Sequence, residues 1–215
     1  MPDDNQFLEN NPSDTKIKIL DAAEKLIIEL GTEKASLRKI TEAAGVNIAA
    51  INYHFGSKNN MLSALMARFL NPLVEDLLNG LENLMVSSAP ALPNLEDIVR
   101  SHLLPMLNFS INHPDYEKMF SRLHVSYDDE NIFKNQIKRI TEKTTKYYGE
   151  CLVKVLPHIP EKTVLKKLAI FKNMATGIMY GDCIMEETID VLGLDGNREE
   201  FIEDMIKFAA AGFRA

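Results

Sequence analysis

The chain is a succession of segments in which apolar residues recur every three or four positions. Between residues 15 and 30 this spacing is followed by Ile19, Ala23, Leu26, Ile27 and Leu30. It predicts an amphipathic helix there, with Asp14 as its N-cap and Gly31 as its end. Nothing in the chain reads as a convincing strand. We therefore expect an all-α fold.

The same periodicity predicts a helix in each of the segments that follow. Pro72 should kink or end one of them, because proline lacks the N–H that the helix ladder needs. Residues 86–93 read as a loop, and Asn197 with Glu200 is a capping signal for the last helix. The expected helices cover 37–44, 48–55, 58–71, 73–85, 95–111, 114–125, 131–155, 161–189 and 198–211.

The helices over 37–44 and 48–55 form the most informative part of the chain. They are short, they meet at Gly45, and Ser36 and Asn47 stand at their N-cap positions. This is the layout of a helix-turn-helix, which places its second helix in the DNA major groove. An ordinary three-helix subdomain would carry some of these residues, but the register of the glycine and both caps favours the DNA-binding interpretation.

Position on the second helix predicts a role for each of its residues. Ile51 and Phe55 lie one turn apart and should face the core with Val46, whereas Ile48 could face either the core or the groove. Asn52 can contact adenine with two hydrogen bonds. Ile48 or Ala49 can pack on a thymine methyl, and Ala50 and Tyr53 also face outward. We expect backbone phosphates to be held by Ser36, Arg38, Tyr53, His54 and Lys58.

Charge is distributed unevenly along the chain. The net charge of −7 argues against a nucleic-acid partner at first, but residues 14–70 carry eight basic against six acidic side chains. The remainder is acidic and would orient the basic segment toward DNA. Cys151 and Cys183 lie in apolar surroundings and are interpreted as buried thiols.

Residues 14–70 resemble the DNA-binding domain of TetR-type (TetR/AcrR family) transcriptional regulators. The matching features are Gly31, Ser36-Leu-Arg-Lys-Ile, Ala43-Ala-Gly-Val-Asn, Ile51-Asn-Tyr-His-Phe and Ser57-Lys. The resemblance implies DNA contacts from the positions of Ser36, Asn47, Tyr53, His54 and Lys58. Thr32 stands where an aromatic residue is usual, Thr41 where a small apolar one is usual, and Ile48 where a polar one is common.

The resemblance also implies an organisation for the whole chain. We expect a disordered arm over residues 1–13, a helix-turn-helix domain over 14–60 and a helical effector-binding and dimerisation domain over 61–215. The protein would be a homodimeric repressor that binds a palindromic operator and is released by a small, largely apolar effector. An activator, or a regulator without a ligand, on the same scaffold is the alternative.

Two sets of apolar positions beyond residue 70 are candidates for these further roles. Stripes on the last two helices could pair two chains or pack within one chain: Leu165, Leu168, Phe171, Ile178, Phe201, Met205 and Phe208. A second set could line an adaptable pocket or simply form core: His102, Met106, Phe109, Phe120, His124, Tyr127, Tyr147, Cys151, Met174 and Tyr180.

Catalysis and metal binding find no support in the sequence. No constellation of acids, bases or nucleophiles stands out, and the five histidines share no metal-ligand spacing. We expect no enzyme activity, no cofactor and no metal; a helical enzyme or metal-binding protein with a vestigial helix-turn-helix is the rival from another class. No apolar run reaches the ~20 residues of a membrane span, and no signal peptide is visible, so a cytoplasmic protein without membrane contact is expected.

Overall fold

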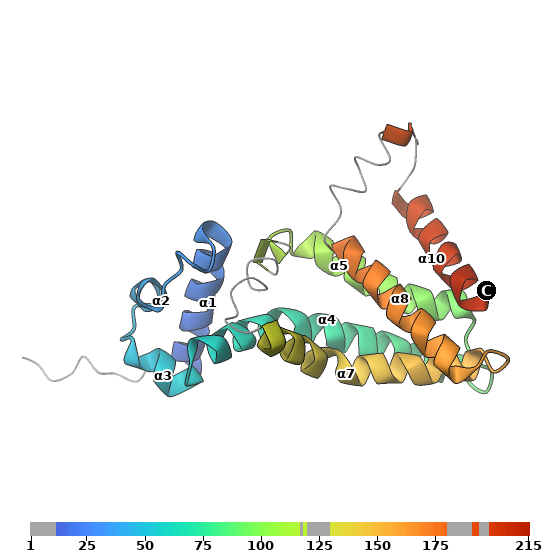
Figure 1. Ribbon diagram of the computed structural model, residues 1–215, viewed down its shortest axis with the longest axis horizontal. Helices are drawn as coiled ribbons and strands as arrows, with labels where there is room; N and C mark the ends of the chain where they lie inside the picture. Colours follow the sequence, from blue (N-terminus) through green and yellow to red (C-terminus); the bar gives the residue numbers. More distant parts are fainter. Residues whose placement is uncertain (1–11, 117, 120–129, 180–190, 194–197) are drawn as a thin grey trace, which may run out of the picture. The chain divides into compact units, whose positions relative to one another are not determined.

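The computed structural model describes residues 12–116, 118–119, 130–179, 191–193 and 198–215. Within these residues every regular element is an α-helix, which confirms the expected fold class (Figure 1). The helices are α1 (Pro12–Leu30), α2 (Leu37–Ala44), α3 (Ala49–Phe55), α4 (Lys58–Ser88), α5 (Leu95–Asn112), α7 (Glu130–Val155), α8 (Glu161–Met179) and α10 (Arg198–Arg214).

Helices α1 and α4 differ most from the expected ones. Helix α1 begins at Pro12, so residues 12 and 13 are helical and Asp14 lies in the first turn instead of capping it. Proline suits the first helical position, where its missing N–H has no partner to lose. Helix α4 runs without a break through Pro72. Apolar residues on both sides of this proline are buried, and their burial outweighs the one ladder hydrogen bond that proline removes.

Some of the expected helix boundaries can be compared with the structure only in part. The helix expected over 114–125 and the last part of the helix expected over 161–189 lie largely outside the described residues, as does the capping residue Asn197. The described residues form two compact units: residues up to 69 with 115–137, and residues 70–114 with 138 onward. A division of the chain after residue 60 stays a prediction.

The first unit is built on α1, which packs against α2 and α3. Its core is the apolar stripe of α1 together with side chains from the next three helices, among them Ile19, Ile27, Ile40, Ile51, Met61 and Leu65. Arg68 Nη1 contacts Asp21 Oδ1 at 2.5 Å and links α4 to α1. These contacts fix the two short helices, which together carry only a few buried residues of their own.

The second unit packs α5, α8 and α10 against one another (Figure 1). Its buried residues come from these three helices and from α4 and α7, among them Leu77, Ile98, Leu152, Val164, Ile206 and Phe213. The hydroxyl of Tyr148 on α7 lies 3.1 Å from Ser101 Oγ and donates to Leu77 O at 3.4 Å. One buried phenol thus links α7 to both α4 and α5.

Helix α10 is fixed to α5 by two ion pairs. Nη1 and Nη2 of Arg214 donate to the carboxylate of Glu96 at 2.6 and 2.7 Å. Arg100 makes the same bidentate interaction with Glu203. Lys167 on α8 donates to the carbonyl of Phe213 at 2.9 Å, near the C-terminus of α10, where a cation is favoured. Among the described helices, none has the length and apolar character to cross a membrane.

Candidate nucleic-acid interface

The turn between α2 and α3 has the local structure that the sequence predicts. Ser36 Oγ accepts from the backbone N–H of Lys39, and α2 ends at Gly45, whose φ of 66° lies in the left-handed region that glycine tolerates. Asn47 Oδ1 accepts from Ala49 N at 2.9 Å. The helix proper begins at Ala49, so Asn47 makes this turn one residue earlier than an N-cap would.

Helix α3 is divided between a buried and an exposed face. Ile51 and Phe55 are buried, as expected, whereas Val46 is only half-buried. Asn52 is exposed, and 81% of the Tyr53 side chain is open to solvent. The seven-residue helix is therefore held by two apolar side chains and presents Ala49, Asn52 and Tyr53 outward.

Ile48 lies on the outer side of the motif, which settles the choice between core and surface at this position. Its side chain is 53% exposed, immediately before the exposed Ala49. A large apolar side chain exposed at the beginning of a candidate recognition helix is available to pack on a base methyl group. Ala50 behind it is half-buried.

An aromatic cluster ends α3. The rings of Tyr53 and His54 meet edge to face with centroids 4.9 Å apart, and Lys16 from α1 lies over the Phe55 ring at 5.6 Å. Asn60 Nδ2 donates to Phe55 O at 2.8 Å and joins the end of α3 to the first turn of α4. Lys58, half-buried, is the first residue of that turn.

Two threonines that depart from the family pattern are accommodated by the fold. Thr41 is buried, and its hydroxyl lies 3.0 Å from Leu37 O and 2.9 Å from Arg38 O, so its polar atom is satisfied inside α2. Thr32 is buried after the α1 C-terminus. At neither position does the substitution leave the side chain exposed.

The predicted ligand-binding residues do not gather around one hollow in the described part of the chain. His102, Met106 and Phe109 are buried along α5, Cys151 is buried on α7 and Tyr147 is half-buried beside it. Met174 is 48% exposed. Phe120, His124, Tyr127 and Tyr180 lie outside the described residues, as does Cys183. The three α5 residues are buried in the way that core residues are.

His102 has an environment that the sequence did not suggest. Its ring meets those of Tyr148 and Phe171 at centroid distances of 4.8 and 5.2 Å. Burial, followed by the nearby charge of Lys172, lowers its pKa to about 3. Within the described residues its Nδ1 has no hydrogen-bond partner. The imidazole is therefore a neutral core group at physiological pH.

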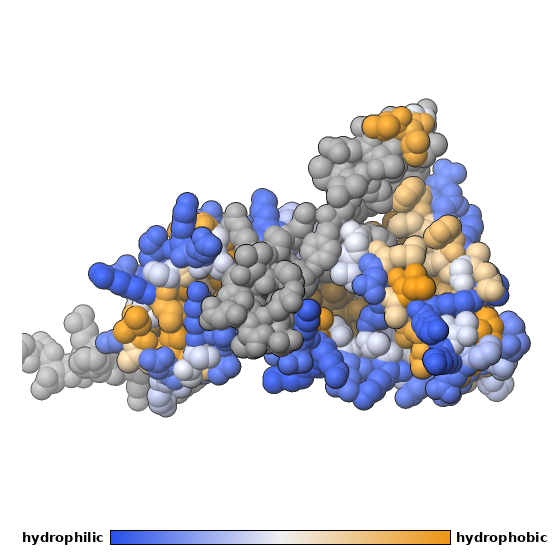
Figure 2. All heavy atoms as spheres, in the orientation of Figure 1, coloured by the Kyte–Doolittle hydropathy of each residue, from blue (hydrophilic) through white to orange (hydrophobic). Residues whose placement is uncertain are grey.

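The predicted dimer residues fall on different faces of α8 and α10. Leu168 and Phe171 are buried within the unit, Phe201 and Met205 are half-buried, and nothing is described for the side chain of Ile178. Phe208 is 69% exposed. Ile170, which was not among the predicted dimer residues, is 61% exposed. Apolar residues gather over α8 and α10 in Figure 2. The signal for Ile170 was its spacing of four residues from Met174.

A shallow hollow of about 110 Å³ marks this outer face between the two helices. It is lined by Lys167, Ile170, Phe171, Met174, Phe208, Ala209, Gly212 and Phe213. Leu165, in contrast, lies on the side of α8 that faces α7. The apolar surface open on α8 and α10 is therefore centred on Ile170, Met174 and Phe208, and we call these three residues the outer apolar face.

Comparison with known proteins bears on the identity of the chain. Residues 19–65 match the family described as "Bacterial regulatory proteins, tetR family". The chain is 24% identical to the HTH-type transcriptional regulator SrpR of Pseudomonas putida over 172 residues, which cover 78% of this chain and 74% of SrpR. It is 38% identical to the HTH-type transcriptional repressor AcnR of Corynebacterium glutamicum over 56 residues, which cover 26% of this chain and 30% of AcnR.

The fold is also that of a solved TetR-family structure. A putative transcriptional regulator from Vibrio parahaemolyticus aligns with a TM-score of 0.55 at 15% identity, over 92% of this chain and 97% of that one. The matched region of the family includes all of α2 and α3, where the caps, the left-handed glycine and the exposed face of α3 are found. Residues 19–65 therefore carry the domain that marks the tetR family of bacterial regulatory proteins, and the chain has the fold of a TetR-family transcriptional regulator.

Proposed function

We propose that this protein is a homodimeric repressor that inserts α3 into the major groove of a palindromic operator. The observation that carries the proposal is the division of α3 into two faces. Ile51 and Phe55 anchor the helix, and Ile48, Asn52 and Tyr53 are left exposed on a rigid support. A recognition helix needs this arrangement, because side chains that read bases must be free while the backbone is fixed.

Each exposed residue has a chemistry that suits DNA. Asn52 offers a donor and an acceptor to the adenine edge, and Ile48 and Ala49 offer apolar surface to a thymine methyl. The small Ala50 allows the helix backbone to approach the groove. Phosphate contacts position a helix on DNA without reading the base sequence. We propose such contacts for the polar residues in and around α3: Ser36, Arg38, Asn47, Tyr53, His54 and Lys58.

Dimerisation is proposed through the outer apolar face. Three large apolar side chains, Ile170, Met174 and Phe208, are each about half exposed or more. Two helices from each of two chains would cover them in a four-helix interface. A symmetric dimer presents two recognition helices, and these must match half-sites one DNA turn apart, roughly 34–36 Å, or a multiple of it. Repression is favoured by the name of AcnR, a repressor.

A ligand response is proposed for the second unit. In one conformation of the dimer the spacing of the two α3 helices would not match the half-sites. A ligand that binds this conformation more tightly would shift the population away from DNA, but only as far as its preference between the two states allows. The hollow between α7 and α8, about 540 Å³, is of a size that suits a small organic molecule. A cytoplasmic location follows from this role.

The proposal is tested by isolating the fragment of the source genome that the full-length protein retains. Binding to that fragment should be specific and sensitive to salt. The logarithm of the binding constant should fall with the logarithm of the salt concentration with a slope of roughly −5 if each DNA-binding domain neutralises about three phosphates. Equal affinity for all duplexes, or no binding at low salt, would contradict it. Light scattering of the free protein gives the oligomeric state in the same preparation.

A further inference from the structure

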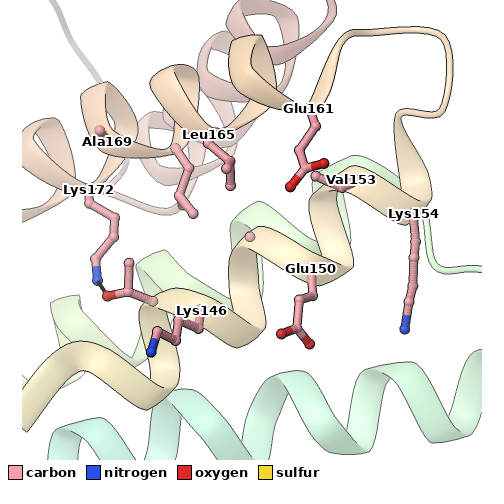
Figure 3. A pocket seen from close by; sticks show the side chains of 11 residues that line it. Lys146, Glu150, Val153, Lys154, Glu161, Leu165, Ala169 and Lys172 are labelled. Atoms are coloured by element: carbon pink, nitrogen blue, oxygen red, sulfur yellow. Dashed lines mark hydrogen bonds between the residues drawn. The ribbon is translucent and has the colours of Figure 1, made fainter.

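A groove runs between the last three turns of α7 and the first three turns of α8 (Figure 3). Its walls are largely apolar, with Val153 from α7 and Leu165, Leu168 and Ala169 from α8. The volume is about 540 Å³, and the groove is open along one side to solvent. None of the residues proposed to contact DNA lies in it.

Gly149 sets how closely the two helices approach at the floor of this groove. A Cβ atom at this position would lie 2.9 Å from Leu165 Cδ2 and 3.6 Å from Leu168 Cδ2. Because glycine has no side chain, both leucines can lean against the α7 backbone. The apolar floor is thus formed by leucine methyl groups on a helix surface.

Lys172 forms one end of the groove. Its side chain points from α8 toward α7, where its ammonium group donates to Thr145 Oγ1 (Figure 3). Burial lowers the pKa of this lysine to about 8, so it still carries its charge at pH 7. Within the described residues it forms no ion pair. A hydroxyl acceptor does not neutralise the charge, and a half-buried cation without a counterion is unfavourable.

The opposite end of the groove carries one charge of each sign. Glu161 on α8 lies there, together with Lys154 on α7 (Figure 3). Glu161 and Lys172 are separated by three turns, or roughly 16 Å along the helix at 1.5 Å per residue. Glu161 and Lys154 together give that end no net charge, whereas Lys172 would attract an anion, so the groove has a direction.

From this arrangement we propose that the groove binds a small amphipathic carboxylate, with its carboxylate on Lys172 and its hydrocarbon chain along Leu165, Leu168 and Val153. The ligand supplies the negative charge that Lys172 lacks and covers the side chain of Leu165, of which 42% is otherwise open to water. This inference deepens the ligand response proposed above, for which it names a chemical class and a site.

Calorimetry of decanoate with the full-length protein at pH 7, without DNA, tests the site. We expect saturable binding of one decanoate per chain. Decanol should bind about tenfold more weakly or less, because it lacks the charge that Lys172 pairs with, and decyltrimethylammonium should bind still less. Equal affinity for decanoate and decanol would overturn the proposal.

Variants identify the groove as the place of binding. Lys172→Met keeps the length and apolar stem of the side chain and should weaken decanoate binding by about tenfold or more. Lys143→Met removes an equally charged but exposed lysine on α7 and should leave binding unchanged. Ala169→Phe, at an exposed position of the groove wall, keeps Lys172 and should block decanoate by filling its path. Unchanged binding in both Lys172→Met and Ala169→Phe would contradict the assignment.

Operator release is measured separately. Addition of decanoate to the protein–DNA complex should weaken operator binding in the wild type and not in Lys172→Met. Because the calorimetry contains no DNA, a failure of decanoate to bind overturns the ligand class and leaves DNA recognition untouched. Loss of specific DNA binding would instead contradict the proposed function.

Discussion

Arg38 donates from Nε to Oε1 of Glu42 at 2.8 Å, one turn further along α2. Both side chains are exposed, at 83% and 59%, so the pair is weak and competes with water. Arg38 is also one of the residues proposed to hold a DNA phosphate. Glu42 therefore holds a guanidinium that DNA would otherwise bind, and it adds a negative charge beside the phosphate backbone.

We accordingly expect Glu42→Gln to tighten binding to every duplex by about two- to fivefold, because it frees Arg38 and removes a repulsive charge. Arg38→Ala should weaken binding to every duplex by a similar factor. Fluorescence anisotropy with the retained fragment and an unrelated duplex measures both. Glu33→Gln removes the same charge from an exposed residue outside the helices and is the control; an equal gain there would show that only net charge matters.

The buried His102 should make stability depend on pH. Its pKa is about 3 when folded and about 6.5 when unfolded, so the unfolded state binds the additional proton between these values. The free energy of unfolding therefore falls as pH decreases below 6.5, by about 2 kcal/mol from this group between pH 7 and pH 5. His102→Gln should remove that part of the pH dependence.

Urea unfolding at pH 7 and pH 5 provides the measurement. The control is His158→Gln, an exposed histidine in the same unit, which should retain the wild-type difference between the two pH values. If His102→Gln lost as much stability on acidification as the wild type, the imidazole could not be a neutral buried group.

Lys172 should lower stability although it serves binding. Its pKa is lower in the folded state, about 8 against 10.5, so the folded state carries a charge at pH 7 that its surroundings disfavour. Lys172→Met is expected to raise the free energy of unfolding at pH 7 by about 3 kcal/mol. The advantage should shrink between pH 8 and 10.5, where the wild-type lysine loses its proton more readily when folded. Destabilisation by Lys172→Met at pH 7 would argue against this description.

The outer apolar face should control the oligomeric state. Ile170→Glu and Phe208→Glu each place a charge where the dimer would bury apolar surface, and each should convert the dimer to monomer. Affinity for the palindromic fragment should fall by about tenfold or more, with little change for a single half-site. Val86→Glu, at an exposed apolar residue of α4, is the matched control. Sedimentation velocity distinguishes the species, and a dimer that persists in both variants would contradict the proposed interface.

Local signals in the sequence predicted much of the first unit. Gly31, Ser36, Gly45 and Ser57 act through their own backbone or through hydrogen bonds to residues close by, so each can be recognised without the fold. The same holds for Ile51 and Phe55, because one turn of helix separates them. Pro72 was misjudged because its effect depends on tertiary burial along α4 rather than on neighbours in sequence.

Assignments in the second unit depended on information that periodicity lacks. A stripe of apolar residues on α8 shows that the helix packs, but not against which partner. Phe171 packs inside the unit, Ile170 next to it is exposed, and Leu165 faces α7. Lys172 was passed over because a lysine on a helix is ordinarily exposed, and its partial burial comes from tertiary packing.

The central claim is that α3 reads base sequence through Asn52 while residues around it hold phosphates. It is tested most directly by measuring the affinities of the wild type, Asn52→Ala and Lys58→Ala for the retained fragment and for a series of single base-pair variants of it. Asn52→Ala should lose discrimination at one position of each half-site, worth about 1–3 kcal/mol, and Lys58→Ala should weaken all duplexes alike. Loss of discrimination in Lys58→Ala, with a uniform loss in Asn52→Ala, would contradict the account.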